Sequence, residues 1–570
     1  MIDLEDKQFK VHNWIVLFIV CAVTFFVNNK VLLPDIMESR NIISAREMVY
    51  EGHWLVPTMN GYLRLEKPPL PTWLTALAEI ASPDNLGLQR SMAGLAAVLL
   101  VLAFFLIGKK IFRDEGTALL SSLILCTCYN VVLMGRTASW DIYTHAFMLM
   151  GIYFLINAFE KEKCSWKDFI LSGVFTGLSI MSKGPVSLFA LLLPFLIAYC
   201  WFYPPKMQGK WKGLAAMAVT SLAIGCWWYA YIYVFNGDAM SSVAAKESDN
   251  WSSHNVRPWY YYWAFFLEAG VWAVLLLSAI FVPIWSWRER EAKEYKFPIL
   301  WMFLTLIILS IPGEKKTRYL LPLMISACYA MGYLINAWKC RFLRRQAHKA
   351  DKIVFRVNAW LLSAVTLLLP AAMFVFAYKP GFLAIGQYAA MSAICIGTSV
   401  FLGYCAIGLK PSGLVGAVAI LFLSAEILAM PALKGIVNNP KMHSIEQTRN
   451  MEVLKGIPFY YDSKDELRIE EVYAAHRNIH PIDCSSTDSL RKALPFAILT
   501  HNSVASELPK GIFDYADTLH IDRYDNNNHP EGNRLHRPIF IYNLTLLTPK
   551  ASKADSVSKR IQALPRSLSK

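Results

Sequence analysis

Long apolar runs with almost no charge recur along this chain, and they constrain its fold more than any other feature. A helix rises about 1.5 Å per residue, so about 20 apolar residues cross the hydrocarbon layer of a membrane. The sequence predicts about thirteen helices of this kind. They cover residues 13–33, 90–108, 117–134, 140–158, 168–182, 184–203, 212–235, 262–286, 297–312, 318–338, 356–378, 382–408 and 412–432. We therefore predict a mainly α-helical membrane protein, because a helix satisfies its own backbone hydrogen bonds in lipid.

The composition supports the membrane class and argues against nucleic-acid binding. Only 17% of the 570 residues are charged, against about 25% in soluble domains. The formal net charge of +14 comes mostly from loops between the apolar runs, where membrane proteins carry their cytoplasmic lysines and arginines. Most of the 11 cysteines lie inside apolar runs and act there as small hydrophobic side chains. No disulfide framework or zinc motif is expected.

The basic loops predict an orientation. Clusters of Lys and Arg occur on every second loop, near residues 109–113, 161–167, 206–212, 288–296 and 339–356. The positive-inside rule places such loops in the cytoplasm. Parity then puts the N-terminus in the cytoplasm, and both the stretch after the first helix and the C-terminal part on the outer, periplasmic side. The first apolar run lacks a small-residue cleavage site and is interpreted as a retained helix.

The composition changes near residue 436. Beyond it, strand-like segments at 459–461, 496–500 and 538–546 alternate with helical patterns at 465–476 and 486–494. We predict three parts. They are a transmembrane domain over residues 1–436, a periplasmic α/β domain over 437–550 and a disordered Ser- and Lys-rich tail over 551–570.

The stretch at residues 34–74 carries charges that are costly to hold at a membrane edge, so it is a candidate site. Asp35 and Glu38 are three residues apart and would share one helix face. The alternative is a surface helix with solvated charges. Glu66 and Lys67 precede a proline run whose fixed backbone would aim them at low entropic cost. Lys67 suits a phosphate oxygen and Glu66 a divalent metal; the alternative is an ion pair at a helix start.

Three other segments on the outer side carry unusual charges. Asp141 begins a predicted helix, where it either serves the site or caps the helix. Lys183 lies between two apolar runs, where it either snorkels to the surface or reaches an anionic head group. Arg318 and Tyr319 follow two lysines on a loop that should be poor in cations. This exception to the positive-inside pattern favours an anionic ligand.

The outer loop at residues 236–258 carries Glu247, His254 and Arg257. His254 is a candidate metal ligand together with Glu66, or else a solvated loop histidine. Glu247 and Arg257 are further candidates for contact with a charged ligand. The Trp and Tyr residues around this loop fit an aromatic belt at the membrane surface, and some of them could also stack on a sugar.

The order of these motifs resembles that of the membrane glycosyltransferases that use polyprenyl-phosphate sugars as donors and share the GT-C fold. The most similar members are the aminoarabinose transferases of lipid A and the protein O-mannosyltransferases. The residues that carry the resemblance are Asp35, Glu38, Ser39-Arg40, Ala45-Arg46-Glu47-Met48, Gly52-His53-Trp54-Leu55-Val56-Pro57, Asn60-Gly61, Glu66-Lys67-Pro68-Pro69, Ser182-Lys183-Gly184-Pro185 and Arg318-Tyr319-Leu320-Leu321-Pro322.

The resemblance implies roles for most of the candidate residues. Asp35 or Glu38 would act in catalysis, and Glu66 with His254 would bind a divalent metal such as zinc, magnesium or manganese. The donor phosphate would be held by Arg40, Lys67, Lys183, Arg318 and Tyr319. One departure concerns the acids. The family has adjacent Asp and Glu here, whereas this chain separates them, so both stay candidates for the base.

These observations predict a monomeric, inverting glycosyltransferase of a Gram-negative inner membrane, in contact with membrane lipids and not with nucleic acid. It would transfer a sugar from a polyprenyl-phosphate donor to lipid A or a related glycolipid at the periplasmic face. A protein O-glycosyltransferase is one alternative. The other is a transporter or flippase of a lipid-linked sugar, although the sequence shows no inverted repeat of the kind such transporters often carry.

Overall fold

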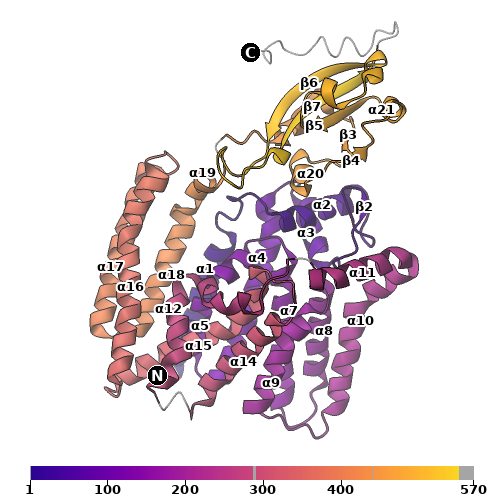
Figure 1. The fold of residues 1–570 in the computed structure, drawn as a ribbon. Coiled ribbons are helices and arrows are strands. Elements are labelled where there is room, and N and C mark those ends of the chain that lie inside the picture. Colours follow the sequence, from indigo (N-terminus) through magenta and orange to yellow (C-terminus); the bar gives the residue numbers. More distant parts are fainter. Residues whose placement is uncertain (1, 254, 287–290, 440, 551–570) are drawn as a thin grey trace. The chain divides into compact units, whose positions relative to one another are not determined.

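The structure is a computed structural model that describes residues 2–253, 255–286, 291–439 and 441–550 (Figure 1). The predicted tail at 551–570 and the candidate ligand His254 lie outside the described residues. The chain forms two compact units. The first contains the chain up to Val31, Met48–Pro57 and Arg64–Leu433, and the second contains Leu32–Glu47, Thr58–Leu63 and the described chain from Lys434 onward.

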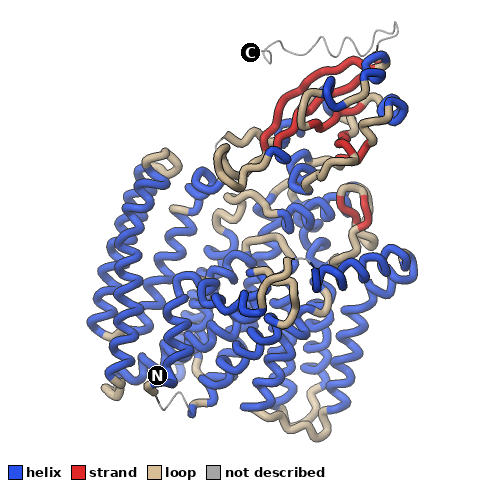
Figure 2. The backbone as a smooth tube through the Cα atoms, in the orientation of Figure 1, coloured by secondary structure: helices blue, strands red, loops and turns tan. Residues whose placement is uncertain are grey.

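The first unit is helical, as Figure 2 shows by colour. Its α-helices are α1 (Ile2–Phe26), α3 (Leu70–Ala81), α4 (Leu86–Phe112), α5 (Glu115–Cys126), α6 (Tyr129–Gly135), α7 (Trp140–Glu160), α8 (Trp166–Lys183), α9 (Leu193–Phe202), α10 (Trp211–Phe235), α11 (Gly237–Ser253), α12 (Ala273–Phe281), α14 (Lys293–Ser310), α15 (Leu321–Leu343), α16 (Lys349–Met373), α17 (Ile385–Gly408) and α18 (Pro411–Leu428). The 3₁₀ helices η2 (Trp259–Trp272) and η4 (Thr317–Leu320) precede α12 and α15, and the π-helix η1 (Leu188–Leu192) precedes α9.

The predicted membrane fold is confirmed, and each of the thirteen predicted segments contains a helix. Among the described residues, eight helices are long and apolar enough to cross a membrane. The number rises to nine if α5 and α6, which meet at a bend of 69°, count as one span. The apolar helices at His12–Phe26 and Leu188–Phe202 are shorter. The number of thirteen spans therefore stays a prediction.

Small residues allow α7, α8 and α10 to pack side by side (Figure 1). Gly173 and Gly177 of α8 face α10 so closely that a Cβ atom on Gly173 would lie 2.6 Å from the backbone oxygen of Met217. Close backbone approach through small residues is a common way for helices to pack in membranes, where burial of apolar surface offers little gain. The glycines of α8 thus allow it to pack tightly against α10.

The second unit contains an α/β domain with a five-stranded sheet of order β4-β3-β5-β7-β6. The strands are β3 (Phe459–Asp462), β4 (Ile479–Ile482), β5 (Phe496–Thr500), β6 (Ala516–Asp525) and β7 (Ile541–Pro549). β3 runs parallel to β4 and β5, and β7 runs antiparallel to β5 and β6. Its helices are α20 (Ile469–Ala475), α21 (Thr487–Ala493) and α22 (Val504–Glu507).

The sheet is covered on both faces. Along β5, Ala497 and Leu499 join one hydrophobic cluster, whereas Phe496 and Ile498 join another. Successive side chains of a strand point to opposite faces, so all five residues of this central strand are buried. The predicted strands at β3, β5 and β7 are confirmed. β4 and β6 were not predicted, because a proline in β4 and alternating polar residues in β6 weaken the apolar signal.

An Asn-Gly turn from the opening stretch completes the edge of this sheet. Asn60 and Gly61 have φ values of 56° and 75°, the left-handed conformation that a tight hairpin needs, and they join β1 (Thr58–Met59) to β2 (Tyr62–Leu63). The Asn60 amide donates to the Ile479 oxygen at 2.7 Å, and its oxygen accepts from the Ile479 nitrogen at 2.8 Å. The Asn60 side chain thereby pairs with both backbone hydrogen-bonding groups of Ile479, at the edge of the sheet. α2 (Ile36–Tyr50) contributes Ile43 to the cluster on one face of the same sheet.

Candidate active site

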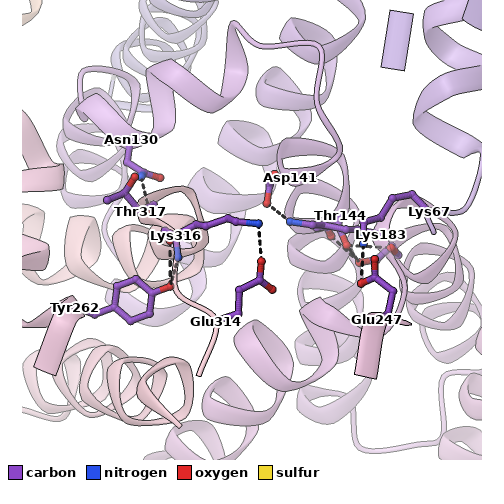
Figure 3. Close-up of polar contacts among 11 residues, drawn as sticks. Lys67, Asn130, Asp141, Thr144, Lys183, Glu247, Tyr262, Glu314, Lys316 and Thr317 are labelled. Atoms are coloured by element: carbon purple, nitrogen blue, oxygen red, sulfur yellow. Dashed lines mark hydrogen bonds and ion pairs between the residues drawn. The ribbon is translucent and has the colours of Figure 1, made fainter. Parts of the chain in front are cut away.

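A buried ion pair between Asp141 and Lys183 forms the centre of the candidate site in the first unit (Figure 3). Asp141 lies in the first turn of α7, and Lys183 is the last residue of α8. The two helices run antiparallel, so these two ends meet. Their side chains are 3% and 7% exposed. A carboxylate at a helix start and an ammonium at a helix end also suit the dipoles of the two helices.

Hydroxyl groups join α7 to α8 about one turn away from the Asp141–Lys183 pair. Thr144 Oγ1 donates to the Ser179 oxygen at 2.9 Å, and Ser179 Oγ donates to the Thr144 oxygen at 2.6 Å. Ser179 Oγ also lies 2.6 Å from Ser187 Oγ. Directly after Lys183, the C-cap residue Gly184 has a φ of 76°, which lets the chain turn sharply. The pair is therefore held on rigid backbone.

The loop before α15 brings further charges to the same place. Lys183 Nζ lies 4.7 Å from the ring centre of Tyr319, within the range of a cation–π contact. Lys316 forms an ion pair with Glu314, and its backbone exchanges two hydrogen bonds with the Tyr262 hydroxyl, at 2.9 and 3.0 Å. The Asn130 amide donates to the Thr317 oxygen at 3.2 Å. These contacts hold the predicted phosphate-binding loop in one conformation.

Lys67 reaches the site from the loop before α3. Its ammonium lies 3.5 Å from the Glu247 carboxylate of α11, and the two side chains are 24% and 36% exposed. The following prolines are buried, and the fixed φ angle of each proline restricts the direction of the chain. A pair this open to water is weak, so Lys67 is available to another anion.

A cavity of about 90 Å³ joins these groups. Its lining residues are Lys67, Asp141, His145, Lys183, Val186, Phe189, Ala190, Glu247, Tyr262, Leu309, Pro312, Glu314 and Tyr319. Cations and acids line part of its wall and apolar side chains line the rest. Such a mixed lining suits an amphipathic ligand whose head group is anionic.

His145 is a residue of this cavity that the sequence analysis missed. It lies four residues after Asp141, hence on the same face of α7. It is 2% exposed, and within the described chain its Nδ1 atom has no hydrogen-bond partner. Its spacing of four residues from Asp141 could have indicated that it faces the same site. A single histidine inside an apolar run gave no other sign of a functional role. Tyr262, which the sequence analysis placed in the aromatic belt, and Glu314, to which it gave no role in the site, line the cavity as well.

Arg318 and Arg257 stand near the cavity without lining it. Arg318 is half-buried on η4, between Thr317 and Tyr319. The guanidinium of Arg257 lies 5.9 Å from the Tyr261 ring, and the Arg257 oxygen accepts from Lys315 Nζ at 3.3 Å. Loss of contact with water lowers the pKa of the Lys315 ammonium.

Asp35, Glu38 and Arg40 belong to the second unit. Asp35 precedes α2 and caps it, because its Oδ1 accepts from the nitrogens of Met37 and Glu38 at 2.8 Å each. Glu38 Oε2 accepts in return from the Asp35 nitrogen at 3.4 Å. This arrangement is a capping box. The two acids therefore meet at a helix start, with Asp35 outside the helix and Glu38 buried in its first turn.

Glu66 has the chemistry of a metal ligand. Its Oε2 atom is buried, and no hydrogen-bond donor in the described part of the chain reaches it. A carboxylate oxygen in this state usually has a cation or water as partner. The second predicted ligand, His254, lies outside the described residues.

Known proteins share both the sequence pattern and the fold. A family model described as dolichyl-phosphate-mannose-protein mannosyltransferase matches residues 66–230, which include Glu66, Lys67, Asp141 and Lys183. An uncharacterized protein of Aquifex aeolicus is 27% identical over 372 residues, which are 64% of this chain and 70% of that protein. The undecaprenyl phosphate-alpha-4-amino-4-deoxy-L-arabinose arabinosyl transferase of Pseudomonas paraeruginosa is 25% identical over 383 residues, or 63% of this chain, and the chain spans 65% of its length.

A solved structure extends this similarity along the chain. The crystal structure of ArnT from Cupriavidus metallidurans bound to undecaprenyl phosphate matches with a TM-score of 0.63 at 15% identity. The match covers 95% of this chain and 98% of that one. At this identity the similarity concerns the fold. The resemblance predicted from the sequence is thus confirmed, and the chain is a membrane protein with the GT-C glycosyltransferase fold.

Proposed function

We propose that this chain transfers a sugar from a polyprenyl-phosphate donor to lipid A or a related envelope glycolipid, at the periplasmic face of a bacterial inner membrane. The cavity that gathers Lys67, Lys183 and Tyr319 beside apolar side chains carries the proposal. It combines cations for a phosphate with an apolar wall for a lipid. The names of the arabinosyl transferase relative and of the undecaprenyl phosphate complex support the donor class.

The donor phosphate would be the leaving group. When the bond between the sugar C1 and the phosphate oxygen breaks, the electron pair stays on the phosphate and its negative charge grows. Lys67 and Lys183 would stabilise that charge in a site poor in water, where fixed cations act strongly. Asp141 is a positioning residue in this scheme, because it holds the Lys183 ammonium at the cavity wall. Arg40, Arg318 and Tyr319 would provide further contacts to the phosphate.

The acceptor needs a base. Asp35 or Glu38 would take the proton of the acceptor hydroxyl or orient its phosphate, while the acceptor oxygen attacks C1. A single displacement would invert the configuration at C1. The capping box uses Asp35 Oδ1, so a conservative Asp35→Asn variant would preserve the cap and remove Asp35 as a candidate base.

Glu66 would hold a divalent metal ion, of which zinc, magnesium and manganese are candidates, with His254 as its partner. Such an ion would supply positive charge near the leaving phosphate. The unpaired carboxylate oxygen of Glu66 supports this role. Transfer should fall after treatment with a chelator and return with one of the three metals. Full activity in the chelator would contradict the role.

The test uses the purified full-length chain in nanodiscs with a radiolabelled undecaprenyl-phosphate sugar and lipid A. Transfer to lipid A should fall at least 100-fold in Lys67→Ala and Lys183→Ala, whereas the exposed Lys352→Ala should be unaffected. Movement of the donor between leaflets without transfer would overturn the proposal in favour of a flippase. Label appearing on added protein instead of lipid A would favour the protein acceptor that the mannosyltransferase match supports.

We also propose that the N-terminus is cytoplasmic, that the α/β domain is periplasmic and that the chain acts as a monomer. The loop charges support this orientation.

A further inference from the structure

The second unit contains a cavity of its own, of about 360 Å³. It lies where the segment before α2, the start of α20 and the loop between β6 and β7 meet. Its lining residues are Leu33, Pro34, Ser39, Met442, Ser444, Glu446, Arg468, Glu470, Glu471, Tyr473, Ala474, Asn526, Asn527, Asn528, His529, Leu535, Arg537 and Phe540. None of the proposed transferase roles uses this cavity.

The polar groups of the cavity are held in place by their neighbours. Arg468 forms an ion pair with Glu470, and its guanidinium lies 4.1 Å from the ring centre of Phe540. Glu471 is 2% exposed and accepts a hydrogen bond from the Asn526 amide. Planar groups fixed in this way are preorganised, which lowers the entropic cost of binding a ligand.

One asparagine shapes the loop that forms the cavity wall. The Asn527 amide donates to Asp525 Oδ1 at 2.8 Å and to the Arg537 oxygen at 3.0 Å. Its Oδ1 accepts from the Arg537 nitrogen at 2.8 Å, and Asn439 donates to the Asn527 oxygen at 3.1 Å. Asn527 is 1% exposed. The loop between β6 and β7 is therefore held open as a wall rather than collapsed onto the sheet.

The charge balance narrows the class of ligand. Burial raises the pKa of Glu471 to about 8, so this carboxyl is mostly protonated at neutral pH and can donate a hydrogen bond. The two remaining acids, Glu446 and Glu470, balance the two arginines, Arg468 and Arg537. A wall that is neutral overall favours neither an anion nor a cation. It offers paired donors and acceptors from carboxyl, guanidinium and amide groups, which match neighbouring hydroxyls.

We propose that this cavity binds a neutral carbohydrate of one or two rings. Its volume lies at the small end of the range for small-molecule sites. Carboxyl and amide groups would bind the hydroxyls, and the Phe540 and Tyr473 side chains would border the ring. The proposal stands apart from sugar transfer, because it needs neither the donor nor the cavity of the first unit.

The test measures binding on the full chain in nanodiscs free of sugar-based detergent. Saturation-transfer NMR and calorimetry use the N-acetylglucosamine disaccharide and maltose as probes, with inorganic phosphate as the anionic comparison. We expect at least one disaccharide to bind and phosphate not to bind. Glu470→Gln and Arg537→Ala should weaken the sugar at least 10-fold, whereas the exposed controls Asp517→Asn and Lys492→Ala should bind as wild type.

Glu470→Gln removes the ion pair with Arg468 and could disturb folding. A second variant tests sugar binding without removing that ion pair. Asn528 is exposed at the cavity, so Asn528→Trp should block the sugar without removing an internal contact. Absence of sugar binding to the folded wild type would overturn the proposal. Binding of phosphate alone, or unchanged sugar affinity in Asn528→Trp, would overturn it too. Because transfer is not measured, an inactive transferase leaves these outcomes unaffected.

Discussion

At the scale of single residues, variants of the Asp141–Lys183 pair can distinguish its contribution to stability from its contribution to sugar transfer. Asp141→Asn leaves a buried ammonium without its partner, which typically costs about 3–5 kcal/mol. The double variant Asp141→Asn/Lys183→Met removes both charges at similar volume and should recover most of that loss. Transfer should stay low in both, because the cavity then lacks an oriented cation. Thermal unfolding and transfer assays measure the two effects, and a double variant that transfers at the wild-type rate would show the pair to be structural only.

Glu471 makes a pH-dependent contribution to the stability of the second unit. Burial foremost, then the charges of Glu470 and Asp525, raises its pKa from 4.5 to about 8, against smaller lowering effects of Arg468 and of the Asn526 hydrogen bond. A raised carboxyl pKa means that the folded form binds the proton more tightly than the unfolded one. The stabilisation is thus complete below about pH 4.5 and is lost as the pH rises through 8.

We therefore expect Glu471→Gln to flatten this dependence. Hydrogen exchange of the β5 amides, corrected for the intrinsic effect of pH, should show wild-type protection that falls between pH 5 and 8, with a much smaller fall in the variant. The matched control is Asp517→Asn, an exposed carboxylate of β6, which should follow the wild type. Identical pH profiles in wild type and Glu471→Gln would contradict the assignment.

The residues of the candidate site differ in how far the sequence could reveal them. Lys67 and Lys183 stand out because a charge in an apolar surrounding is costly. His145 was hidden, since one histidine within a helix is compatible with ordinary packing. Asp35 was singled out for its charge, but its role as a helix cap depends on where α2 begins, and the sequence pattern sets such boundaries only loosely.

At the scale of elements, the close contact of α8 with α10 predicts a sensitive glycine. A Cβ atom at Gly173 would lie 2.6 Å from the Met217 oxygen and 2.9 Å from Thr220 Cβ. The Met217 oxygen belongs to the backbone of α10 and cannot move aside alone. Gly173→Ala should therefore push α8 away from α10 and lower the free energy of unfolding by about 1–3 kcal/mol. The shift would also move Lys183 at the end of the same helix. The temperature of thermal unfolding and the rate of sugar transfer should both fall.

Gly397 of α17 is the matched control, because a Cβ built there would meet no atom of another element within 4 Å in the described part of the chain. Gly397→Ala replaces a poor helix former by the best one, so it should leave stability unchanged or raise it by up to about 1 kcal/mol. Equal effects of the two substitutions would show that helix propensity, and not the contact with α10, governs the result.

Elements followed from the sequence wherever one physical rule dominated. The need to satisfy the backbone in lipid fixed the helices of the first unit, and alternating or continuous apolar residues marked β3, β5 and β7. β4 escaped prediction because its proline weakens the apolar pattern, and because its edge is completed by Asn60, which lies far away in the sequence. Pairing between distant segments of this kind cannot be deduced from local patterns.

At the scale of the whole molecule, the loop charges predict a single orientation that can be measured. Lys352 is exposed near the start of α16, beside the richest basic cluster, and Asp517 is exposed on β6. The positive-inside rule puts the first in the cytoplasm, and parity puts the second in the periplasm. The experiment introduces Lys352→Cys or Asp517→Cys, with the exposed Cys200 and Cys340 replaced by serine. A membrane-impermeant maleimide should label intact spheroplasts of the Asp517→Cys variant only. It should label Lys352→Cys only after lysis. The opposite pattern would place the Asp141–Lys183 cavity at the cytoplasmic face, and the proposed transfer to periplasmic lipid A would then have to be abandoned.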